Sequence, residues 1–225
     1  MERLRSKRQG NRIIAVGKPK IAFALRHSTP GQPLRYNCRV KPRWIIALLL
    51  LAVLAGGTWG FYYHWREHRF DPIILAAARR YGIEPALVKA VAWRESWFNP
   101  RARGRAGEIG LMQLQETAAR EWADAEHVPA FAHEHCFDPG TNALAGAWYL
   151  HKLLLRYART DHPAPFALAD YNAGRGNLLK WNRGAAATNS AVFIEQIGFP
   201  GTKNYVQSVL QRCEHYRPVF PPNGN

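Results

Sequence analysis

The distribution of apolar and charged residues separates one uncharged segment from the rest of the chain. Residues 44–63, WIIALLLLAVLAGGTWGFYY, contain no charged side chain and show no polar face. Twenty residues of α-helix extend about 30 Å, the thickness of the hydrocarbon layer of a bilayer. Aromatic residues stand at both ends of the run, as is typical of membrane–water interfaces. The pattern predicts one transmembrane helix over residues 44–63.

After this segment, apolar residues recur at spacings of three and four, the period of amphipathic helices, and no strand-like alternation competes with them. Asp-Pro pairs at 71–72 and 138–139 are typical helix starts, with the aspartate as N-cap. Thr202 is expected to cap a last helix that ends near Tyr216. Helices are therefore expected from 71 to 81, 85 to 98, 110 to 125, 138 to 158, 163 to 174 and 202 to 216.

These helices predict a mainly α, globular domain over residues 71–216. A polar linker at 64–70 precedes it and a Pro-rich tail at 217–225 follows it. In the long helix from 138, we expect Leu144, Trp148 and Leu155 to share the buried stripe, with small residues beside them for close packing. Residues 99–109 are expected to form a loop, and a small β-hairpin around residues 101–110 is an alternative for this segment. Residues 184–190 are expected to form a flexible link.

Charge is concentrated before the apolar segment. The net charge of the chain is +15, and residues 1–43 hold 12 of the 31 Lys and Arg but only one acid. Few aromatics and several prolines in this arm predict disorder. By the positive-inside rule, residues 1–43 lie in the cytoplasm and residues 64–225 lie across the membrane. We therefore expect a single-pass membrane protein whose folded domain lies on the far side of the membrane from the cytoplasm.

Two alternatives to this topology are weaker. Residues 53–55 resemble a signal-peptide cleavage site, but the basic region is too long and the apolar run continues past the site. A nucleic-acid-binding arm is also conceivable, yet membrane orientation and attraction to anionic lipids explain the arm more simply. We expect no nucleic-acid partner. Cys136 and Cys213 fall on the exported side, where they are expected to pair, with two separate buried thiols as the alternative.

One acidic residue stands out within the predicted helix from Pro85. Glu95 lies three to four residues beyond Val91 and Ala92, on or beside the apolar side of the helix. Partial desolvation and the negative end of the helix dipole both favour a protonated carboxyl there. A carboxylic acid that stays neutral near pH 7 can serve as a general acid. The alternative is a surface glutamate paired with Arg94.

Short motifs follow Glu95 in a fixed order: 97–100 (WFNP), 110–114 (GLMQL), 171–174 (YNAG) and 202–206 (TKNYV). Together with Glu95-Ser96 they resemble the lytic transglycosylases of the soluble-lytic-transglycosylase, goose-lysozyme-like family. The resemblance covers about residues 70–216. It implies a lysozyme-like fold and cleavage of peptidoglycan, the glycan strands of the bacterial wall.

The resemblance also implies roles for individual residues. Glu95 is the catalytic acid, and no cofactor is required. Candidate substrate contacts are Met112, Gln113, Tyr171, Asn172 and Tyr205, with both tyrosines near the acid. The acid would protonate the oxygen between N-acetylmuramic acid and N-acetylglucosamine, and the muramyl 6-hydroxyl would then close a 1,6-anhydro ring.

The sequence departs from the family pattern at two places. Gly104 stands where family members often carry a serine, and residues 201–203 read Gly-Thr-Lys where Glu-Thr-Arg is common. Glu108 is the candidate for a second carboxylate, with Glu116 behind it. Residues 133–136, HEHC, suggest zinc, but their spacing does not bring ligands together, so we expect no metal.

Other functions remain to be separated from this one. A hydrolytic muramidase of the same fold would use Glu95 with water, and a non-catalytic docking module would bind peptidoglycan without cleaving it. The sequence leaves open cleavage at chain ends or internally, self-association, and service to an envelope-spanning machine.

Overall fold

The computed structural model describes residues 42–220, and every regular element in that range is helical. The expectations for residues 1–41 and 221–225 lie outside the described residues. The elements are α1 (Pro42–His68), α2 (Asp71–Arg80), α3 (Pro85–Ser96), α4 (Glu116–Ala125), η1 (His133–Phe137), α5 (Pro139–Arg156), α6 (Pro163–Ala173), α7 (Arg175–Trp181), η2 (Gly184–Ala187), α8 (Ser190–Gln196) and α9 (Pro200–Tyr216).

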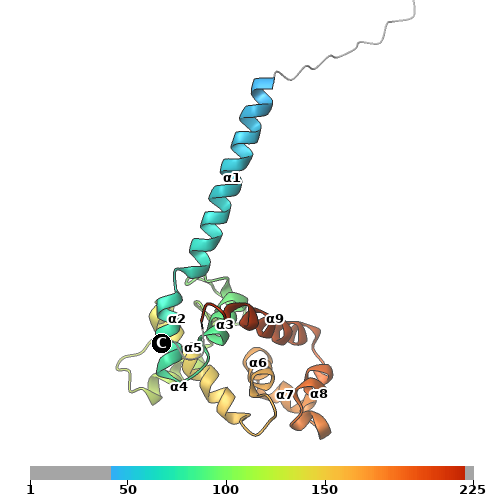
Figure 1. The fold of residues 1–225 in the computed structure, drawn as a ribbon. Helices are drawn as coiled ribbons and strands as arrows, with labels where there is room; N and C mark the ends of the chain where they lie inside the picture. The colour runs from blue at the N-terminus through green and yellow to red at the C-terminus, as the bar shows by residue number, and fades with distance from the viewer. Residues whose placement is uncertain (1–41, 221–225) are drawn as a thin grey trace, which may run out of the picture. The chain divides into compact units, whose positions relative to one another are not determined.

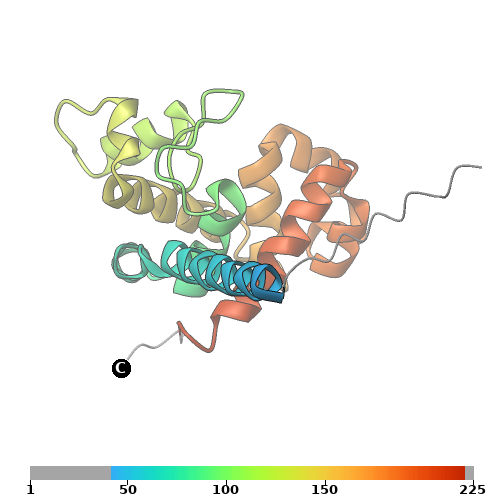
Figure 2. The ribbon, with the colours of Figure 1, turned by 90° about the horizontal axis from the view of Figure 1, so that it is seen from above.

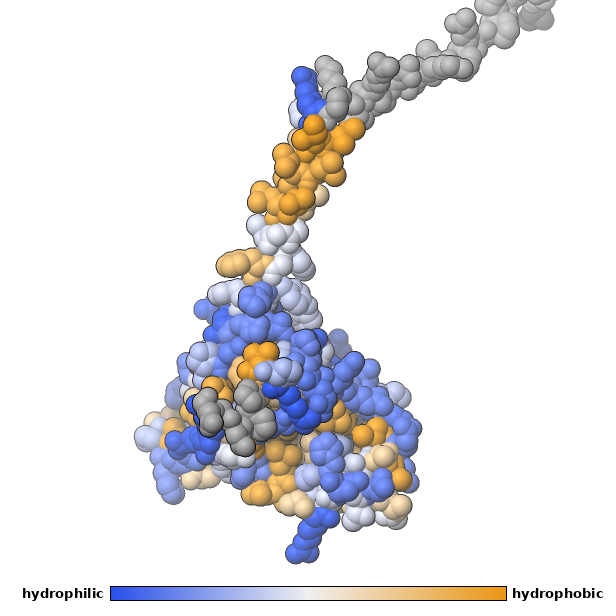
Figure 3. Space-filling view, viewed as in Figure 1, coloured by the Kyte–Doolittle hydropathy of each residue, from blue (hydrophilic) through white to orange (hydrophobic). Residues whose placement is uncertain are grey.

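The apolar segment forms most of α1. Its large side chains are exposed, and they give the orange surface along this helix in Figure 3. Among the described residues, one helix is long and apolar enough to cross a membrane. Residues 64–70, predicted as a polar linker, are largely helical: α1 continues through His68, and a single turn then leads to α2.

Helix α3 lies inside the globular part. All eight residues from Pro85 to Ala92 are buried. Its most extensive contact is with α9, and the two helices lie side by side in Figures 1 and 2. Helix α9 also packs on α6, and α5 packs on α2 and α6. Two helices from distant parts of the sequence, α3 and α9, are thus brought into direct contact.

The proline starts are confirmed for α2, α3, α5 and α6, each of which has proline in its first two positions. The predicted caps are only partly right. The Asp138 side chain accepts a hydrogen bond from the Thr141 backbone N–H, as an N-cap does. Asp71 instead lies within the first turn of α2, and Thr202 within the first turn of α9, so neither residue caps a helix.

Three local predictions are corrected by tertiary contacts. Residues 110–113 form a turn, Leu114 pairs with Ile109 in an isolated bridge, and α4 begins only at Glu116. The hairpin at 101–110 is reduced to an isolated antiparallel bridge between Arg103 and Ile109. The link at 184–190 contains the 3-10 helix η2 and the start of α8, whose Phe193 stacks on Phe166 at 4.2 Å in the core.

The buried side of α5 also differs from the prediction. Leu155 is 61% exposed, and the buried residues of α5 include Ala143, Ala147 and Leu150. Small residues do allow close packing, because a Cβ at Gly146 would lie 2.3 Å from the Met112 sulfur. The expected disulfide is wrong: Cys136 and Cys213 are separate, buried, free cysteines, and burial raises the pKa of each thiol to about 12.

Candidate active site

Glu95 lies in the last turn of α3, where the chain reverses sharply. Two successive residues after the helix, Trp97 and Phe98, have left-handed backbone φ angles of 55° and 58°. L-residues other than glycine rarely adopt this conformation, which costs roughly 1–2 kcal/mol per residue. Such strain persists only where surrounding contacts enforce it, and it is often found at functional sites. The reversal leaves Glu95 half-buried at the end of a helix whose first two turns are in the core.

Tyr205 is the direct partner of Glu95. Its hydroxyl donates a hydrogen bond of 2.6 Å to Glu95 Oε1. The tyrosine projects from α9 and is only 2% exposed, so its hydroxyl faces the carboxyl and is shielded from solvent. Burial and the neighbouring carboxylate raise the pKa of Tyr205 well above its usual value, which keeps the hydroxyl protonated and available as a donor.

The environment of Glu95 favours the neutral carboxyl. Desolvation raises its pKa from 4.5 to about 7. The Tyr205 hydrogen bond and the positive charge of Arg94 act in the opposite direction, while the negative charge of Glu108 adds to the increase. Arg94 makes its direct contacts with α9: its Nε donates to Ser208 Oγ, and its guanidinium lies 5.5 Å from the Tyr205 ring centroid. Within residues 42–220, Arg94 forms no ion pair with Glu95, so the alternative of a surface ion pair is not observed.

The turn at 110–113 is held by a buried amide that the sequence did not single out. Asn142, on α5, is fully buried and donates to the carbonyl oxygens of Ile109 and Cys136 at 2.9 Å each. Its Oδ1 accepts from the Met112 N–H at 2.8 Å. Gly110, with φ +81°, fits against this amide, because a Cβ there would lie 2.1 Å from Asn142 Nδ2. Nothing in local periodicity reveals a contact across thirty residues.

Two further hydrogen bonds tie the turn to the site. The Ser96 hydroxyl donates to the Leu111 carbonyl at 2.7 Å, and the Tyr171 hydroxyl donates to the Met112 carbonyl at 2.7 Å. The Met112 side chain itself is fully buried against Gly146. Met112 therefore differs from the predicted substrate contact: its side chain packs in the core, and its carbonyl fixes Tyr171.

Gln113 and Glu108 lie where the loop folds over. Gln113, at a positive φ of 48°, uses its Nε2 to donate to the carbonyls of Gly110 at 3.0 Å and Ala102 at 3.2 Å. Glu108 Oε2 accepts from the Ala106 N–H at 3.0 Å. Gly104 faces both residues, because a Cβ there would lie 2.1 Å from Glu108 Oε2 and 3.1 Å from Gln113 Oε1.

These residues line two adjoining cavities. One, of about 120 Å³, is lined by Glu95, Glu108, Gln113, Gln115, Tyr171 and Asn172. The other, of about 290 Å³, shares four of these residues and extends past Thr117, Tyr149 and Gly174. Because the shared residues lie between the two cavities, the cavities form one groove with Glu95 at one end. The groove is lined largely by hydroxyl, amide and carboxyl groups, which can hydrogen-bond a polar ligand.

The remaining predicted residues divide between the groove and the surface. Asn172 lines the groove, and its Oδ1 accepts from the Thr202 hydroxyl at 2.8 Å, which links α6 to α9. Glu116 instead pairs with Arg120 on the exposed side of α4. Within residues 42–220, no group of three or more potential ligands could hold a metal ion. His133, from the HEHC segment, hydrogen-bonds the Leu114 carbonyl at 2.9 Å.

Comparison with known proteins places this groove in a family. The model of the family described as "Transglycosylase SLT domain" matches residues 72–194, which is more than half of the chain. The chain belongs to this family. The match begins in the first turn of α2 and includes Glu95, the turn at 110–113 and Tyr171, but it ends before Tyr205.

Individual proteins similar to this chain are named lytic murein transglycosylases. The soluble lytic murein transglycosylase of Escherichia coli K12 is 31% identical over 176 residues, covering 76% of this chain and 26% of the relative. Membrane-bound lytic murein transglycosylase C of Pectobacterium atrosepticum is 34% identical over 192 residues, covering 74% of this chain and 52% of the relative. The chain thus spans about a quarter to a half of the length of these relatives.

A solved structure shows the same fold. The structure of an inactive variant of the lytic transglycosylase Slt from Pseudomonas aeruginosa matches 68% of this chain and 24% of its own, with a TM-score of 0.62 and 28% identity. The prediction of a mainly α, lysozyme-like SLT domain is therefore confirmed.

Proposed function

We propose that this protein is a peptidoglycan lytic transglycosylase that cleaves the β-1,4 bond between N-acetylmuramic acid and N-acetylglucosamine. The observation that carries the proposal is the setting of Glu95. Its carboxyl lies at one end of a polar groove, with a pKa raised to about 7 by desolvation and the Tyr205 hydroxyl at 2.6 Å. The names of the relatives support the same reaction.

In the first step, protonated Glu95 donates its proton to the bridging oxygen of the glycosidic bond. The bond from muramyl C1 to this oxygen breaks, and N-acetylglucosamine leaves with a free hydroxyl. Positive charge develops on the muramyl ring, as in other glycosidases. A general acid is most effective when its pKa lies near the working pH, which a value of about 7 satisfies at neutral pH.

In the second step, the substrate supplies its own nucleophile. The 6-hydroxyl of the muramyl residue attacks C1, and the Glu95 carboxylate accepts the hydroxyl proton. The new C1–O6 bond closes a 1,6-anhydro ring and returns Glu95 to its protonated form. No water is consumed, so one carboxyl group serves both steps.

The other residues hold the acid and the sugar. Tyr205, which is buried, positions the Glu95 carboxyl and stabilises its charge between the two steps. Tyr171, Asn172 and Gln113 line the groove and are the proposed substrate contacts. Because the Tyr171 hydroxyl is already bonded to the Met112 carbonyl, it offers the substrate an oxygen whose orientation is fixed.

We propose that the domain acts next to a membrane. Residues 44–63 would span the bilayer of a bacterial inner membrane, residues 1–43 would stay in the cytoplasm, and residues 71–216 would form the periplasmic catalytic domain. The apolar helix and the relatives named membrane-bound support this topology. A domain held at the membrane could trim the wall for an envelope-spanning machine.

A second reaction is supported by one observation. Glu108 lines the same cavity as Glu95, so the described site holds two carboxyl groups. Glycosidases that use water have two carboxyl groups flanking the scissile bond. In this alternative Glu108 would activate a water molecule, and the product would carry a reducing end in place of the anhydro ring.

The test is digestion of purified sacculi by the full-length protein, with mass spectrometry of the soluble products. We expect 1,6-anhydromuramyl ends, and loss of at least about hundredfold in rate for Glu95→Gln, since general acids contribute about 10²–10⁴-fold. Glu116→Gln is the matched control, because within residues 42–220 Glu116 pairs only with exposed Arg120. Reducing ends would establish hydrolysis instead. Unchanged cleavage by Glu95→Gln would refute the assignment of the acid, and binding without cleavage by wild type would establish a docking module.

A further inference from the structure

The last turn of α1 contacts the end of the catalytic helix. Arg66 Nε donates a hydrogen bond of 2.6 Å to the Trp97 carbonyl, and Arg69 Nη2 donates one of 2.8 Å to the Phe98 carbonyl. Both acceptors belong to the strained pair that directly follows Glu95 and Ser96. A segment that the sequence suggested was a linker therefore touches the loop that ends α3.

These two hydrogen bonds stabilise backbone carbonyl groups in a strained turn. The carbonyl group of Trp97, the C-cap residue of α3, has no partner within the helix, and the helix dipole concentrates negative charge there. A guanidinium group satisfies such an oxygen with a charge-assisted hydrogen bond, which is stronger than a neutral one. Trp97 and Phe98 also lie in the left-handed region, so the chain there would relax if its partners were removed.

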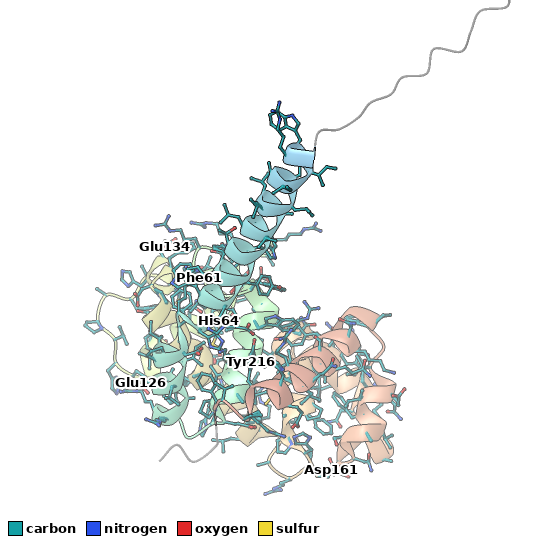
Figure 4. All side chains as sticks on the ribbon, turned by 45° about the horizontal axis from the view of Figure 1, so that its top comes forward. Phe61, His64, Glu126, Glu134, Asp161 and Tyr216 are labelled. Atoms are coloured by element: carbon teal, nitrogen blue, oxygen red, sulfur yellow. The ribbon has the colours of Figure 1, made fainter. Side chains whose placement is uncertain are left out.

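Other contacts hold the arginines in place. Glu67, between them, accepts a 2.6 Å hydrogen bond from the hydroxyl of Tyr216 at the end of α9, which is labelled in Figure 4 near the base of α1. The Tyr63 ring meets the Trp97 ring edge-on at 4.9 Å. Arg69 lies 4.7 Å from the Trp65 ring and 4.5 Å from the Phe70 ring, so its guanidinium is packed between aromatic faces.

A buried ion pair also joins the middle of α3 to the start of α2, next to the end of α1. Lys89, on α3, has no exposed surface and lies 2.8 Å from Asp71 Oδ1, at the start of α2. Its Nζ is also 3.3 Å from His68 Nδ1, the last residue of α1. Removing one partner of a buried pair is strongly destabilising, so the end of α1 is bound to α3 at both the middle and the end of that helix.

We propose that Arg66 and Arg69 are positioning residues for Glu95, and that residues 63–69, which form the end of α1 and the start of the turn after it, are part of the catalytic unit. The proposal rests on the proposed function and adds to it the source of the acid's geometry. The two guanidinium groups fix the carbonyls of residues 97 and 98. The fixed turn in turn holds Ser96 on the Leu111 carbonyl and keeps Glu95 half-buried beside Tyr205.

The test compares full-length variants in detergent: Arg66→Ala/Arg69→Ala, the same pair changed to lysine, and Arg79→Ala as control. Arg79 is exposed on α2, and its side chain makes no hydrogen bond or ion pair with another described residue. We expect the double alanine variant to lose about tenfold to hundredfold in kcat, because misplacement of a catalytic group by about 1 Å can cost that much. KM should stay within about twofold, since the groove lining is untouched.

A second readout separates positioning from folding. The charged and titratable groups that face Glu95 are Arg94 from its own helix, Tyr205 from α9, Tyr171 from α6 and Glu108 from the loop, and all four remain in the variant. If the turn relaxes, Glu95 becomes more hydrated, so the basic limb of the pH–rate profile should move to lower pH. The lysine pair keeps one charged donor at each position and should recover most of the rate.

The possible results separate the positioning role from the proposed function. Absence of anhydro products from wild type would point to the proposed function itself. An active wild type, with the double alanine variant equal to Arg79→Ala in kcat and pH profile, would overturn the positioning role. A fall in rate that only follows the folded fraction measured by thermal unfolding, with an unmoved pH profile, would also overturn it.

Discussion

At the scale of single residues, the site depends on a carboxyl group kept out of water. Glu95 is one turn away from a buried stretch of α3, and its neighbours are a phenol, an arginine bonded to α9 and a second carboxylate. Burial is the largest effect on its pKa, and the Tyr205 hydrogen bond partly offsets it. The two effects can be separated by mutation because they have opposite signs.

Removing the phenol tests the smaller effect. In Tyr205→Phe the carboxylate loses a donor that stabilises its charged form, so the pKa of Glu95 should rise above about 7. The basic limb of the pH–rate profile should move to higher pH, and kcat should fall because the carboxyl is less well held. Tyr62→Phe removes an exposed phenol from α1 and should leave the profile unchanged. A profile that stays in place in Tyr205→Phe would contradict the assignment of Glu95 as the group that titrates.

Removing the carboxyl tests the larger effect through stability. The pKa of Glu95 is 4.5 in its ordinary state and about 7 in the fold, so the folded protein binds more protons between these values. The stability that the neutral carboxyl contributes is complete below about 4.5 and is lost as the pH rises through about 7. Glu95→Gln should therefore unfold at a higher temperature than wild type at pH 8, with no difference near pH 4.5. Equal melting temperatures at both pH values would show that the carboxyl is hydrated in the fold.

At the scale of elements, the groove depends on a turn that is not itself regular structure. Residues 110–113 are held by Asn142 from α5, by Ser96 from α3 and by Tyr171 from α6. Three helices thus converge on one irregular segment. Loops that carry function are usually held by a rigid scaffold in this way.

Loss of the polar side chain that holds this turn should lower the stability of the fold. Asn142→Ala would leave the Met112 N–H and the carbonyls of Ile109 and Cys136 buried without this partner. Because each orphaned buried group costs roughly 1–3 kcal/mol, we expect a loss of about 3 kcal/mol in the free energy of unfolding. Urea unfolding of both proteins measures it. Asn204→Ala, at an exposed position of α9, should change the free energy by less than about 0.5 kcal/mol.

These elements show what the sequence can reveal. Proline and apolar spacing located α2, α3, α5 and α6, because helix starts depend on local chemistry. The turn at 110–113 is predicted as helix because apolar residues cluster there, but Leu111, Met112 and Leu114 are buried in an irregular segment that Asn142 and Tyr171 hold through the Met112 backbone. Glu95 and Tyr205 came from motifs that resemble a family. Asn142 carries no such motif, and only packing reveals it.

At the scale of the whole molecule, topology across a membrane is the main prediction still to be tested. The apolar helix, the basic arm before it and the relatives named membrane-bound all support an exported domain. The three cysteines provide a direct probe. Cys136 and Cys213 are buried and free in the structure, so a large thiol reagent cannot reach them in the folded domain.

Labelling should therefore report on Cys38 alone. In intact spheroplasts, a membrane-impermeant maleimide should leave the protein unmodified, because Cys38 would lie in the cytoplasm. Permeabilisation should add one label, and denaturation should add two more; mass spectrometry counts them. A label on Cys38 in intact spheroplasts would reverse the proposed orientation. Recovery of the chain without residue 38 from the membrane fraction would instead establish cleavage of the N-terminal segment.

Gly104 leaves room for the Glu108 carboxylate, so the loop cannot accept a larger side chain at 104 without moving Glu108. Any side chain at 104 would occupy the place of the Glu108 carboxylate, which is only 2.1 Å from the position of a Cβ, and the flexible glutamate would have to swing aside. A serine side chain at position 104 and the Glu108 carboxylate in its present position would overlap, so both cannot be present at once. In homologues with a serine at this position, a glutamate at 108 should accordingly turn its carboxylate away from position 104.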